Sequence, residues 1–305
     1  MKANLHLHSR FSDGTDWPAD IVRRAAAAGL EHVSLTDHDT LAGTAEFAAE
    51  AIRSGIKTTV GVEIDCREAS IDYKSELLAY FPEGGFARTE AFLAEICRDR
   101  LDIARKAVAA ASRLFPSAAL GFEALLGRKR ADRAMLPPER FSFNKVDVFL
   151  YLKAAGAIRP DMEYRLFKKT YFDSRLLIEK SHDKPSCAEV AKVVRSDGGF
   201  LVIPHIGHEF ADSAETIEKE RKRFSAFLDY FRSIGIAGLE LYWYRNGETK
   251  AINRLIRKEA KSRGLFCTFG SDCHGPSSGK ETLPEFSGAF AGFPRKNKTA
   301  VAAGE

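Results

Sequence analysis

Residues 4–14 of the chain read NLHLHSRFSDG, which places His6 and His8 one residue apart. The alternation of these histidines with leucines predicts a short β-strand that packs one face into a core. Because side chains alternate along a strand, both imidazoles lie on one face, with Leu5 and Leu7 on the other. Two imidazoles on one face can bind a single cation. An HxH pair also arises by chance or as a buried polar contact, so its meaning depends on the rest of the sequence.

Strand-like apolar segments alternate with amphipathic helical segments in the first and last parts of the sequence. Strands are predicted at residues 3–8, 32–36, 58–64, 75–81, 199–205, 237–243 and 265–271. Helices are predicted at residues 17–30, 42–55, 213–235 and 248–264. This alternation is typical of an α/β fold with a parallel sheet, which we expect to close into a barrel-like structure.

The middle of the sequence departs from this pattern. Residues 85–184 read as helices rich in Ala, Arg, Lys and Phe, and this stretch is far too long for an ordinary βα connection. We therefore expect a discontinuous barrel domain formed by residues 1–84 and 185–295. Residues 85–184 would form an inserted, mostly helical subdomain that caps the active site.

The composition is that of an ordinary globular protein with one large domain or two medium ones. The 305 residues are 45% hydrophobic and 29% charged. A net charge of +4 favours anionic substrates only weakly, and nucleic-acid-binding proteins usually concentrate their positive charge more strongly.

The sequence contains neither a signal-peptide pattern nor an apolar run long enough to cross a bilayer, so we expect no membrane association. Its five cysteines are scattered and never spaced as CxxC. This pattern favours reduced thiols and a cytoplasmic location over a disulfide framework or a thiolate zinc site. The oligomeric state is left open.

Histidines and acids stand at or near the ends of the predicted strands. The carboxyl ends of parallel strands share one face of a βα fold, so these side chains are expected to converge on one rim. Buried carboxylates and imidazoles without a cation among them would be unfavourable, which argues for a metal site. The residues are His6, His8, Asp13, Asp37, His38, Glu63, Glu76, His205, Glu240, Asp272 and His274.

Four motifs resemble those of the polymerase and histidinol phosphatase (PHP) superfamily: HLHSRFSDGT (6–15), LTDHDT (35–40), GVEI (61–64) and GSDCHG (270–275). The helical insertion, followed by GGFLVIPHIG (198–207), is most similar to the stand-alone metal-dependent phosphoesterase branch. The resemblance covers residues 1–82 and 198–276. It implies a distorted (β/α)7 barrel with a trinuclear centre of manganese, iron or zinc.

Carried onto the matching positions, the resemblance implies shared ligands for two to three divalent metal ions. The first would be surrounded by His6, His8, Glu63 and Asp272. Glu63 would bridge to the second, which would also be held by Glu76 and His205. The third would be held by Asp13, His38 and His274. Such mixed imidazole and carboxylate ligands suit Mn, Fe or Zn without selecting one of them.

The sequence departs from this branch at several positions. Glu76 stands where the branch usually carries histidine, and it either favours harder metals such as Mn or Fe(II) or weakens the second metal site. An Arg-Pro-His segment of the branch corresponds here to FSFNKVD (141–147), in which Asn144 and Lys145 are candidate substrate-binding residues. After His205, the usual Pro-Gly-Arg is replaced by residues 206–208, Ile-Gly-His.

The resulting hypothesis is hydrolysis of a phosphate monoester, a small phosphorylated metabolite or nucleotide. A hydroxide bridging the metals would attack phosphorus, with Asp272 among the catalytic residues. His208 is the candidate acid that protonates the leaving group. Arg10 is a candidate phosphate ligand because guanidinium binds phosphate in bidentate fashion, and Glu240 is a further candidate for substrate binding.

Aspartates flank His38 on both sides, and either Asp37 or Asp39 could orient its imidazole. A ligating imidazole usually donates its other N–H to a carboxylate or a carbonyl group.

Two rival functions remain. A 5′-3′ exonuclease or oligonucleotide phosphodiesterase would use the same metals, and GRKRADR (127–133) and RLFKKTYF (165–172) place charge beside aromatics as single strands require. Such clusters are more often solvated helix faces, so nucleic acid is not the favoured partner. A non-catalytic metal-binding module is the second rival, although the nearly complete ligand set argues against it.

Overall fold

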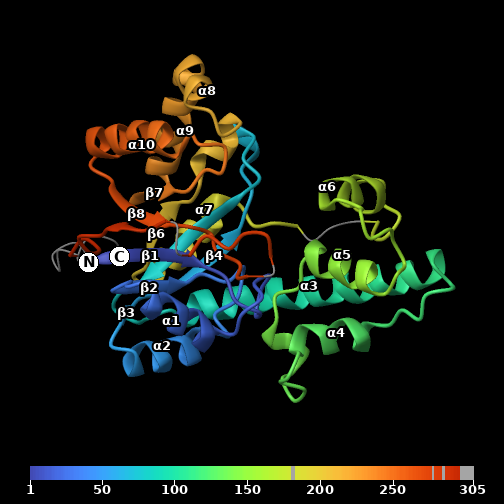
Figure 1. Cartoon of the computed structure of the whole chain (residues 1–305). Helices are drawn as coiled ribbons and strands as arrows, with labels where there is room; N and C mark the ends of the chain where they lie inside the picture. Colours follow the sequence, from blue (N-terminus) through green and yellow to red (C-terminus); the bar gives the residue numbers. More distant parts are fainter. Residues whose placement is uncertain (180–182, 277, 284–285, 296–305) are drawn as a thin grey trace.

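Two open β-sheets form one lobe of the molecule (Figure 1). The computed structural model describes residues 1–179, 183–276, 278–283 and 286–295. The first sheet has the order β3-β2-β1-β9, formed by Lys57–Thr58, His32–Leu35, Lys2–Leu7 and Gly288–Ala289. The second has the order β4-β5-β6-β7-β8, formed by Val60–Asp65, Glu76–Phe81, Phe200–Ile203, Gly238–Tyr242 and Phe266–Gly270.

The α/β class is confirmed, but the two sheets do not close into the expected barrel. Where they meet, isolated backbone bridges join Leu7 to Cys273 and His38 to Glu63. The expectation of a parallel sheet is also wrong at β5, which runs antiparallel to both β4 and β6. Only residues 66–75 connect β4 to β5, too short a stretch for the crossover that parallel neighbours need.

The reversed direction of β5 explains how Glu76 reaches the rim. Glu76 is the first residue of β5 and pairs with Asp65, the last residue of β4. The amino end of β5 therefore lies beside the carboxyl ends of its antiparallel neighbours β4 and β6. An acid at the start of a strand thus joins acids and histidines at the ends of others.

Helices cover the outer faces of both sheets. On the first sheet, α1 (Pro18–Ala27) and α2 (Thr44–Arg53) bury Ile21, Val22 and Phe47. The largest apolar core lies beside the second sheet and includes buried residues of α7 (Cys187–Ser196), α8 (Ala214–Lys219), α9 (Arg221–Ser233) and α10 (Thr249–Arg263). Short helical turns occur at η1 (Ala69–Ile71) and η4 (Ile206–Phe210).

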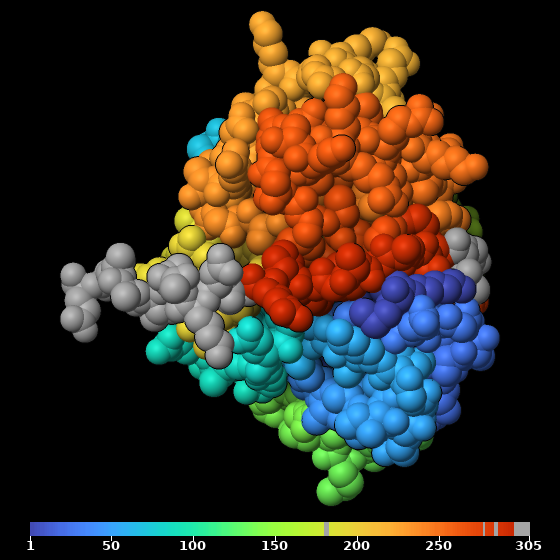
Figure 2. All heavy atoms as spheres, turned by 90° about the vertical axis from the view of Figure 1, so that its left-hand side faces the viewer, coloured from blue at the N-terminus to red at the C-terminus, as the bar shows by residue number. Residues whose placement is uncertain are grey.

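Residues 286–295, which include β9, close the side of the sheet lobe that faces away from the rim. Figure 2 shows them as a red band between the orange region of α8 to α10 and the blue region of α1 and α2. The ring of Phe293 packs near Tyr80, Phe200 and Phe266, and that of Phe290 near His32. These contacts fill the end of the sheets opposite to the candidate site.

A second lobe consists of helices (Figure 1). It contains α3 (Ala87–Leu114), α4 (Phe122–Arg130), η2 (Pro138–Arg140), α5 (Lys145–Ala154), α6 (Tyr164–Phe167) and the π-helix η3 (Lys168–Asp173). The long helix α3 belongs to both lobes, because Leu93 and Ile96 are in the core of the sheets whereas Leu101 and Val108 are in a separate apolar cluster. The domain boundaries at residues 84 and 184 stay a prediction. Over the described residues, none of the helices has both the length and the apolar composition to cross a bilayer.

Replacing Gly61 by valine is expected to push the sheets apart and lower the free energy of unfolding by about 1–3 kcal/mol, a typical cost of overpacking. Gly61 lies on β4, and a Cβ there would sit 2.4 Å from Ser34 Oγ and 2.9 Å from Thr36 Cγ2. Urea unfolding measures the change. Gly127→Ala is the control, because a Cβ at this exposed helical position meets nothing within 4 Å. An unchanged unfolding midpoint for Gly61→Val would contradict the packing described here.

Candidate metal centre

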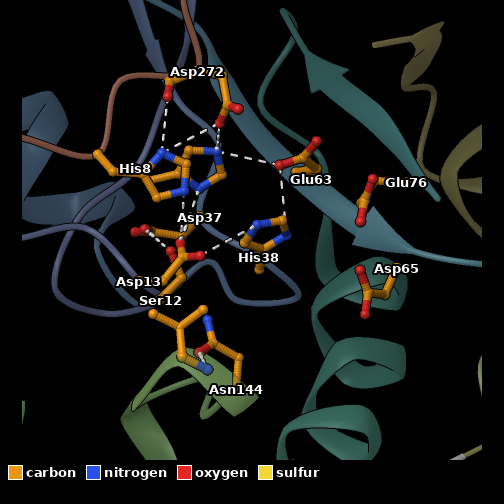
Figure 3. A network of polar contacts seen from close by, with 12 residues as sticks. His8, Ser12, Asp13, Asp37, His38, Glu63, Asp65, Glu76, Asn144 and Asp272 are labelled. Atoms are coloured by element: carbon orange, nitrogen blue, oxygen red, sulfur yellow. Dashed lines mark hydrogen bonds and ion pairs between the residues drawn. The ribbon is translucent and has the colours of Figure 1, made fainter. Parts of the chain in front are cut away.

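All nine residues expected as metal ligands lie at the rim where strands of the two sheets end, several of them visible in Figure 3. His6 is on β1, Glu63 is on β4 and Glu76 begins β5. The others lie in the segments that follow β1, β2, β6 and β8, namely His8, Asp13, His38, His205, Asp272 and His274. Segments far apart in the sequence therefore meet at one place.

Three groups of possible ligand atoms occur among the described residues, each with its atoms within 4.8 Å of one another. They are His6, His8, Glu63 and Asp272; Glu63, Glu76 and His205; and His8, Asp13, His38 and His274. Glu63 and His8 each belong to two groups. This grouping agrees with the ligand sets that the resemblance implies and adds His8 to the third. The role of these residues as ligands stays a prediction.

Glu63 is at the middle of the arrangement. Its Oε2 lies 3.1 Å from His6 Nε2 and 3.2 Å from His8 Nε2, and its Oε1 lies 3.1 Å from His205 Nε2. Asp272 Oδ1 is 3.1 Å from His8 Nε2. Ligand atoms about 2.0–2.2 Å from one metal ion are separated from each other by distances of this order.

Several buried atoms at the rim lack a hydrogen-bond partner, which tests whether the residues fit a cation. They are both ring nitrogens of His8, Nδ1 of His38 and Oδ1 of Asp13. Buried polar atoms are nearly always satisfied by a hydrogen bond, an ordered water or an ion. Cations between these atoms would satisfy one ring nitrogen of His8, Nδ1 of His38 and Oδ1 of Asp13. The residues present therefore fit divalent metal ions.

Charge at the rim leads to the same conclusion. Burial alone would raise the pKa of Glu63, but His6 and His38 hold it well below its usual range. Burial alone would lower the pKa of His8, but the carboxylates of Asp272 and Glu63 raise it to about 10. Without a cation the imidazole of His8 retains its proton, and a divalent metal ion that binds there would release it.

Glu240 is not placed as expected. Its side chain is fully buried, with Oε1 2.8 Å from His6 Nδ1 and Oε2 accepting from the backbone N–H of His205 at 2.9 Å. The assignment of Glu240 to substrate binding is therefore corrected, because neither oxygen is open to a ligand. The carboxylate fixes the His6 ring so that Nε2 faces Glu63, the usual role of a carboxylate behind a ligating imidazole.

The aspartates beside His38 also have other roles than expected. Asp37 accepts hydrogen bonds from the backbone N–H and the hydroxyl of Ser9, both at 2.6 Å, and from the hydroxyl of Ser12 at 2.5 Å (Figure 3). It thereby holds the loop that carries Asp13. Asp39 pairs instead with Arg100. The serines that follow the HxH pair, Ser9 and Ser12, are the sequence signal that points to this network.

A cavity of about 670 Å³ opens between the rim and the helical lobe. Asp13, His38 and Glu76 line it from the rim. The helical lobe contributes Arg100, Ile103, Ala104, Phe143, Asn144, Lys145, Val146, Val148, Tyr164, Lys168 and Phe172. The helices thus form a wall of the cavity next to the candidate metal centre.

The two candidates from the insertion both line this cavity, but Asn144 has a structural role as well. Its Oδ1 caps α5 by accepting from the backbone N–H groups of Val146 and Asp147. Lys145 Nζ lies 5.2 Å from the centre of the Phe172 ring. Lys168 also lines the cavity. It belongs to the basic segment 165–172, for which the sequence favours a solvated helix face.

The last two candidates lie outside the cavity lining. Arg10 Nη1 donates to the carbonyl oxygen of Arg128 at 3.5 Å, so its guanidinium is directed to α4. The ring of His208 is 4.8 Å from the ring of His205, and its Nδ1 is 2.5 Å from Asp212 Oδ1. The geometry therefore keeps His208 beside the candidate centre and offers no support for Arg10.

Comparisons with known proteins agree with this geometry. A family model described as PHP domain matches residues 4–123. The chain is 26% identical over 275 residues to a phosphoribosyl 1,2-cyclic phosphate 1,2-diphosphodiesterase of Eggerthella lenta, covering 90% of this chain and 95% of that protein. It is 29% identical over 280 residues to a 3′,5′-nucleoside bisphosphate phosphatase of Chromobacterium violaceum, covering 90% and 88%.

Solved structures show the same fold. A proposed metal-dependent phosphoesterase of Bifidobacterium adolescentis is similar with a TM-score of 0.66 and 24% identity, covering 90% of this chain and 87% of that chain. An amidohydrolase of Chromobacterium violaceum, with bound sulfate and no metal, is similar with a TM-score of 0.67 and 27% identity, covering 91% and 89%.

Replacing Glu63 by glutamine is expected to weaken the binding of Mn²⁺ by at least about tenfold, since even outer partners of metal ligands contribute 10–100-fold. Glu63 belongs to two of the three ligand groups, and the amide removes its negative charge. Calorimetric titration with Mn²⁺ and elemental analysis measure the effect. Glu218→Gln, at an exposed position on α8, is the control. Metal content equal to that of the unaltered protein would exclude Glu63 as a shared ligand.

Proposed function

We propose that this chain, whose residues 4–123 match the PHP domain family model, is a metal-dependent phosphoric ester hydrolase that hydrolyses a phosphate monoester of a small metabolite or nucleotide. The observation that carries this proposal is the set of three adjacent ligand groups that share Glu63 and His8 at the end of a cavity. Neighbouring cation sites suit the in-line displacement of a phosphate ester.

The three ligand groups are proposed to hold two to three divalent ions, in the arrangement that the family resemblance implies. Bound there, such ions would acidify a water molecule and neutralise charge on the phosphoryl oxygens. The chain's own residues keep the ligands in place: Glu240 fixes His6, and Asp37 holds the loop that carries Asp13. Asp272 would act as a ligand, and it accepts a hydrogen bond from Lys280 Nζ at 2.9 Å.

The metals are proposed to be Mn or Fe(II) rather than Zn because of Glu76. Its Oε2 lies 3.9 Å from His205 Nε2. Burial, together with the neighbouring Asp65 and Glu63, raises the pKa of Glu76 to about 7. A carboxylate at this position adds a hard oxygen ligand and a negative charge, which suit Mn and Fe(II) better than zinc.

The far wall of the cavity is basic, which favours a substrate with a second anionic group. Lys145, Lys168 and Lys184 come from three separate segments of the chain. Burial lowers the pKa of Lys145, and the charges of Lys168 and Lys184 lower it further, so both of these groups repel the ammonium of Lys145. Within the described residues, Lys184 pairs with Asp65 at 3.3 Å, whereas Lys145 and Lys168 form no ion pair. An anion bound among them would relieve this repulsion.

The relatives of Eggerthella lenta and Chromobacterium violaceum support a substrate with two anionic groups, since each is named for a substrate with two phosphate groups. We propose that one phosphate lies at the metal centre and the other at the lysine wall. Phe143, Tyr164 and Phe172 would contact the organic part between them. The cavity volume is in the usual range for small-molecule sites, about 300–1,000 Å³.

The test compares phosphate release from a nucleoside 3′,5′-bisphosphate with release from the matching 3′-monophosphate, in the presence of Mn²⁺. We expect kcat/KM to be at least about tenfold higher for the bisphosphate, because an added charge-assisted contact contributes about 1.5–3 kcal/mol. Lys145→Gln and Lys168→Gln should abolish most of this preference. Lys169→Gln, at the exposed position next to Lys168 but outside the cavity lining, is the matched control.

Other outcomes would overturn the proposal. Equal kcat/KM for the two nucleotides would show that a second phosphate group does not bind at the lysine wall. Faster shortening of a labelled oligonucleotide would establish a nuclease instead. The structure argues against this function, because Lys129 and Arg133 of the basic segment 127–133 are already paired with Asp147 and Glu46. Less than one metal ion per chain, with no phosphate release at any added metal, would favour the non-catalytic module.

His208 is proposed to protonate the leaving group through Nε2, because its Nδ1 is engaged by Asp212. His208→Gln should lower kcat for an alkyl phosphate by about 10²-fold or more, the usual contribution of general acid catalysis. The same change should affect p-nitrophenyl phosphate only slightly, since p-nitrophenolate leaves without a proton. Asp212→Asn should give a weaker form of the same pattern. An equal loss with both substrates would assign His208 another role.

A further inference from the structure

We propose that Arg100 is a positioning residue that fixes His38 and Glu63 relative to each other and thereby sets the metal affinity of the centre. The inference rests on the proposed function only in taking these two residues as metal ligands. Arg100 lies on α3, outside the strands of the two sheets, and the sequence around it does not indicate a role. Its side chain is 7% exposed.

The guanidinium of Arg100 joins three segments. Nη2 donates to Asp39 and, at 2.6 Å, to Asp65 Oδ2, while Nη1 donates to the carbonyl oxygen of Phe143 at 3.3 Å. A planar guanidinium presents several donors in a fixed arrangement, so it can satisfy two carboxylates and a carbonyl at once. A lysine ammonium at this position would lack that geometry.

Both carboxylates bound by Arg100 are close in sequence to expected ligands. Asp39 directly follows His38, and Asp65 is two residues after Glu63. The backbone N–H of Asp39 donates to the Glu63 carbonyl at 2.8 Å, and that of Asp65 donates to Asp39 Oδ1 at 2.9 Å. Arg100 therefore closes a small network that fixes the spacing between the two ligand-bearing segments.

The conformation of Asp39 needs external support. Its φ of 52° lies in the left-handed region, which is unfavourable for a residue other than glycine. One turn before Arg100, Cys97 Sγ also donates to the Asp39 carbonyl oxygen at 3.2 Å. Two residues on α3 thus hold Asp39: Cys97 binds its backbone carbonyl group and Arg100 binds its carboxylate.

Charge makes Arg100 hard to replace. Asp39 and Asp65 are adjacent buried carboxylates, and Lys184 pairs with Asp65 at 3.3 Å. Without the guanidinium, Asp39 would lose its ion pair with Arg100, and removing one partner of a buried ion pair is strongly unfavourable. The segments that carry His38 and Glu63 would then separate.

The contact with Phe143 extends the effect to the cavity. Phe143 immediately precedes Asn144 and Lys145, which line the cavity on the helical side. The same guanidinium therefore connects the metal ligands with the wall that faces the substrate.

The test measures Mn²⁺ binding to the full chain by calorimetry in the absence of substrate, so its outcome does not depend on which phosphate ester is hydrolysed. Arg100→Gln is expected to weaken Mn²⁺ binding by about 10–100-fold, as for other residues that orient ligands. Arg100→Lys should restore part of this affinity because it keeps the charge. Arg98→Gln, at a 63% exposed position on the same helix, is the matched control and should bind Mn²⁺ like the unaltered protein.

Activity titrated with Mn²⁺ provides the second measurement. If Arg100 acts through the ligands, excess Mn²⁺ should return kcat of Arg100→Gln to within a few-fold of the unaltered value. If Arg100→Gln does not fold, the test rests on Arg100→Lys. A several-fold weaker Mn²⁺ affinity in folded Arg100→Lys supports the inference. Unchanged Mn²⁺ affinity in either folded variant overturns it, as does a loss of kcat that saturating Mn²⁺ does not restore.

Discussion

The buried carboxylate of Glu63, within about 3 Å of three imidazoles, is the contact on which the rest of the structure depends. Ionisable groups can be buried at this density only when opposite charge compensates them. Residues that touch no substrate serve this requirement, because Glu240 holds His6 from behind and Arg100 neutralises the acids beside His38 and Glu63. The rim is thus a group of opposite charges that compensate one another, and its ligand groups fit divalent metal ions.

Strand periodicity predicts most of the residues at this rim correctly. It does not predict the direction of β5. Alternation shows which face a side chain occupies, so His6 and His8 could be placed together from the sequence alone. It contains no information on strand direction, since a strand read in either sense has the same period. The antiparallel course of β5 was therefore missed, although Glu76 was still expected at the rim.

Residues whose role depends on distant partners could not be assigned from the sequence. Asp37 binds the serines near His8, and Asp39 binds an arginine on α3, about sixty residues away. Glu240 stands at the end of a strand like a ligand, yet both of its oxygens are used by His6 and His205. Nothing in the local pattern distinguishes an acid that faces the cavity from one that supports a ligand from behind.

The helical lobe does more than cover the site, because it also holds one of the expected ligand loops. Lys129 on α4 donates to the carbonyl oxygen of Ser12, and the indole of Trp17 donates to Asp132 at 2.9 Å. The backbone N–H of Ser142 donates to the carbonyl oxygen of Phe11 at 2.8 Å. These contacts enclose Asp13 from both sides along the chain. A displacement of the helices would therefore move Asp13 as well as the lysine wall, so the lobe that lines the cavity also determines whether the third ligand group is complete.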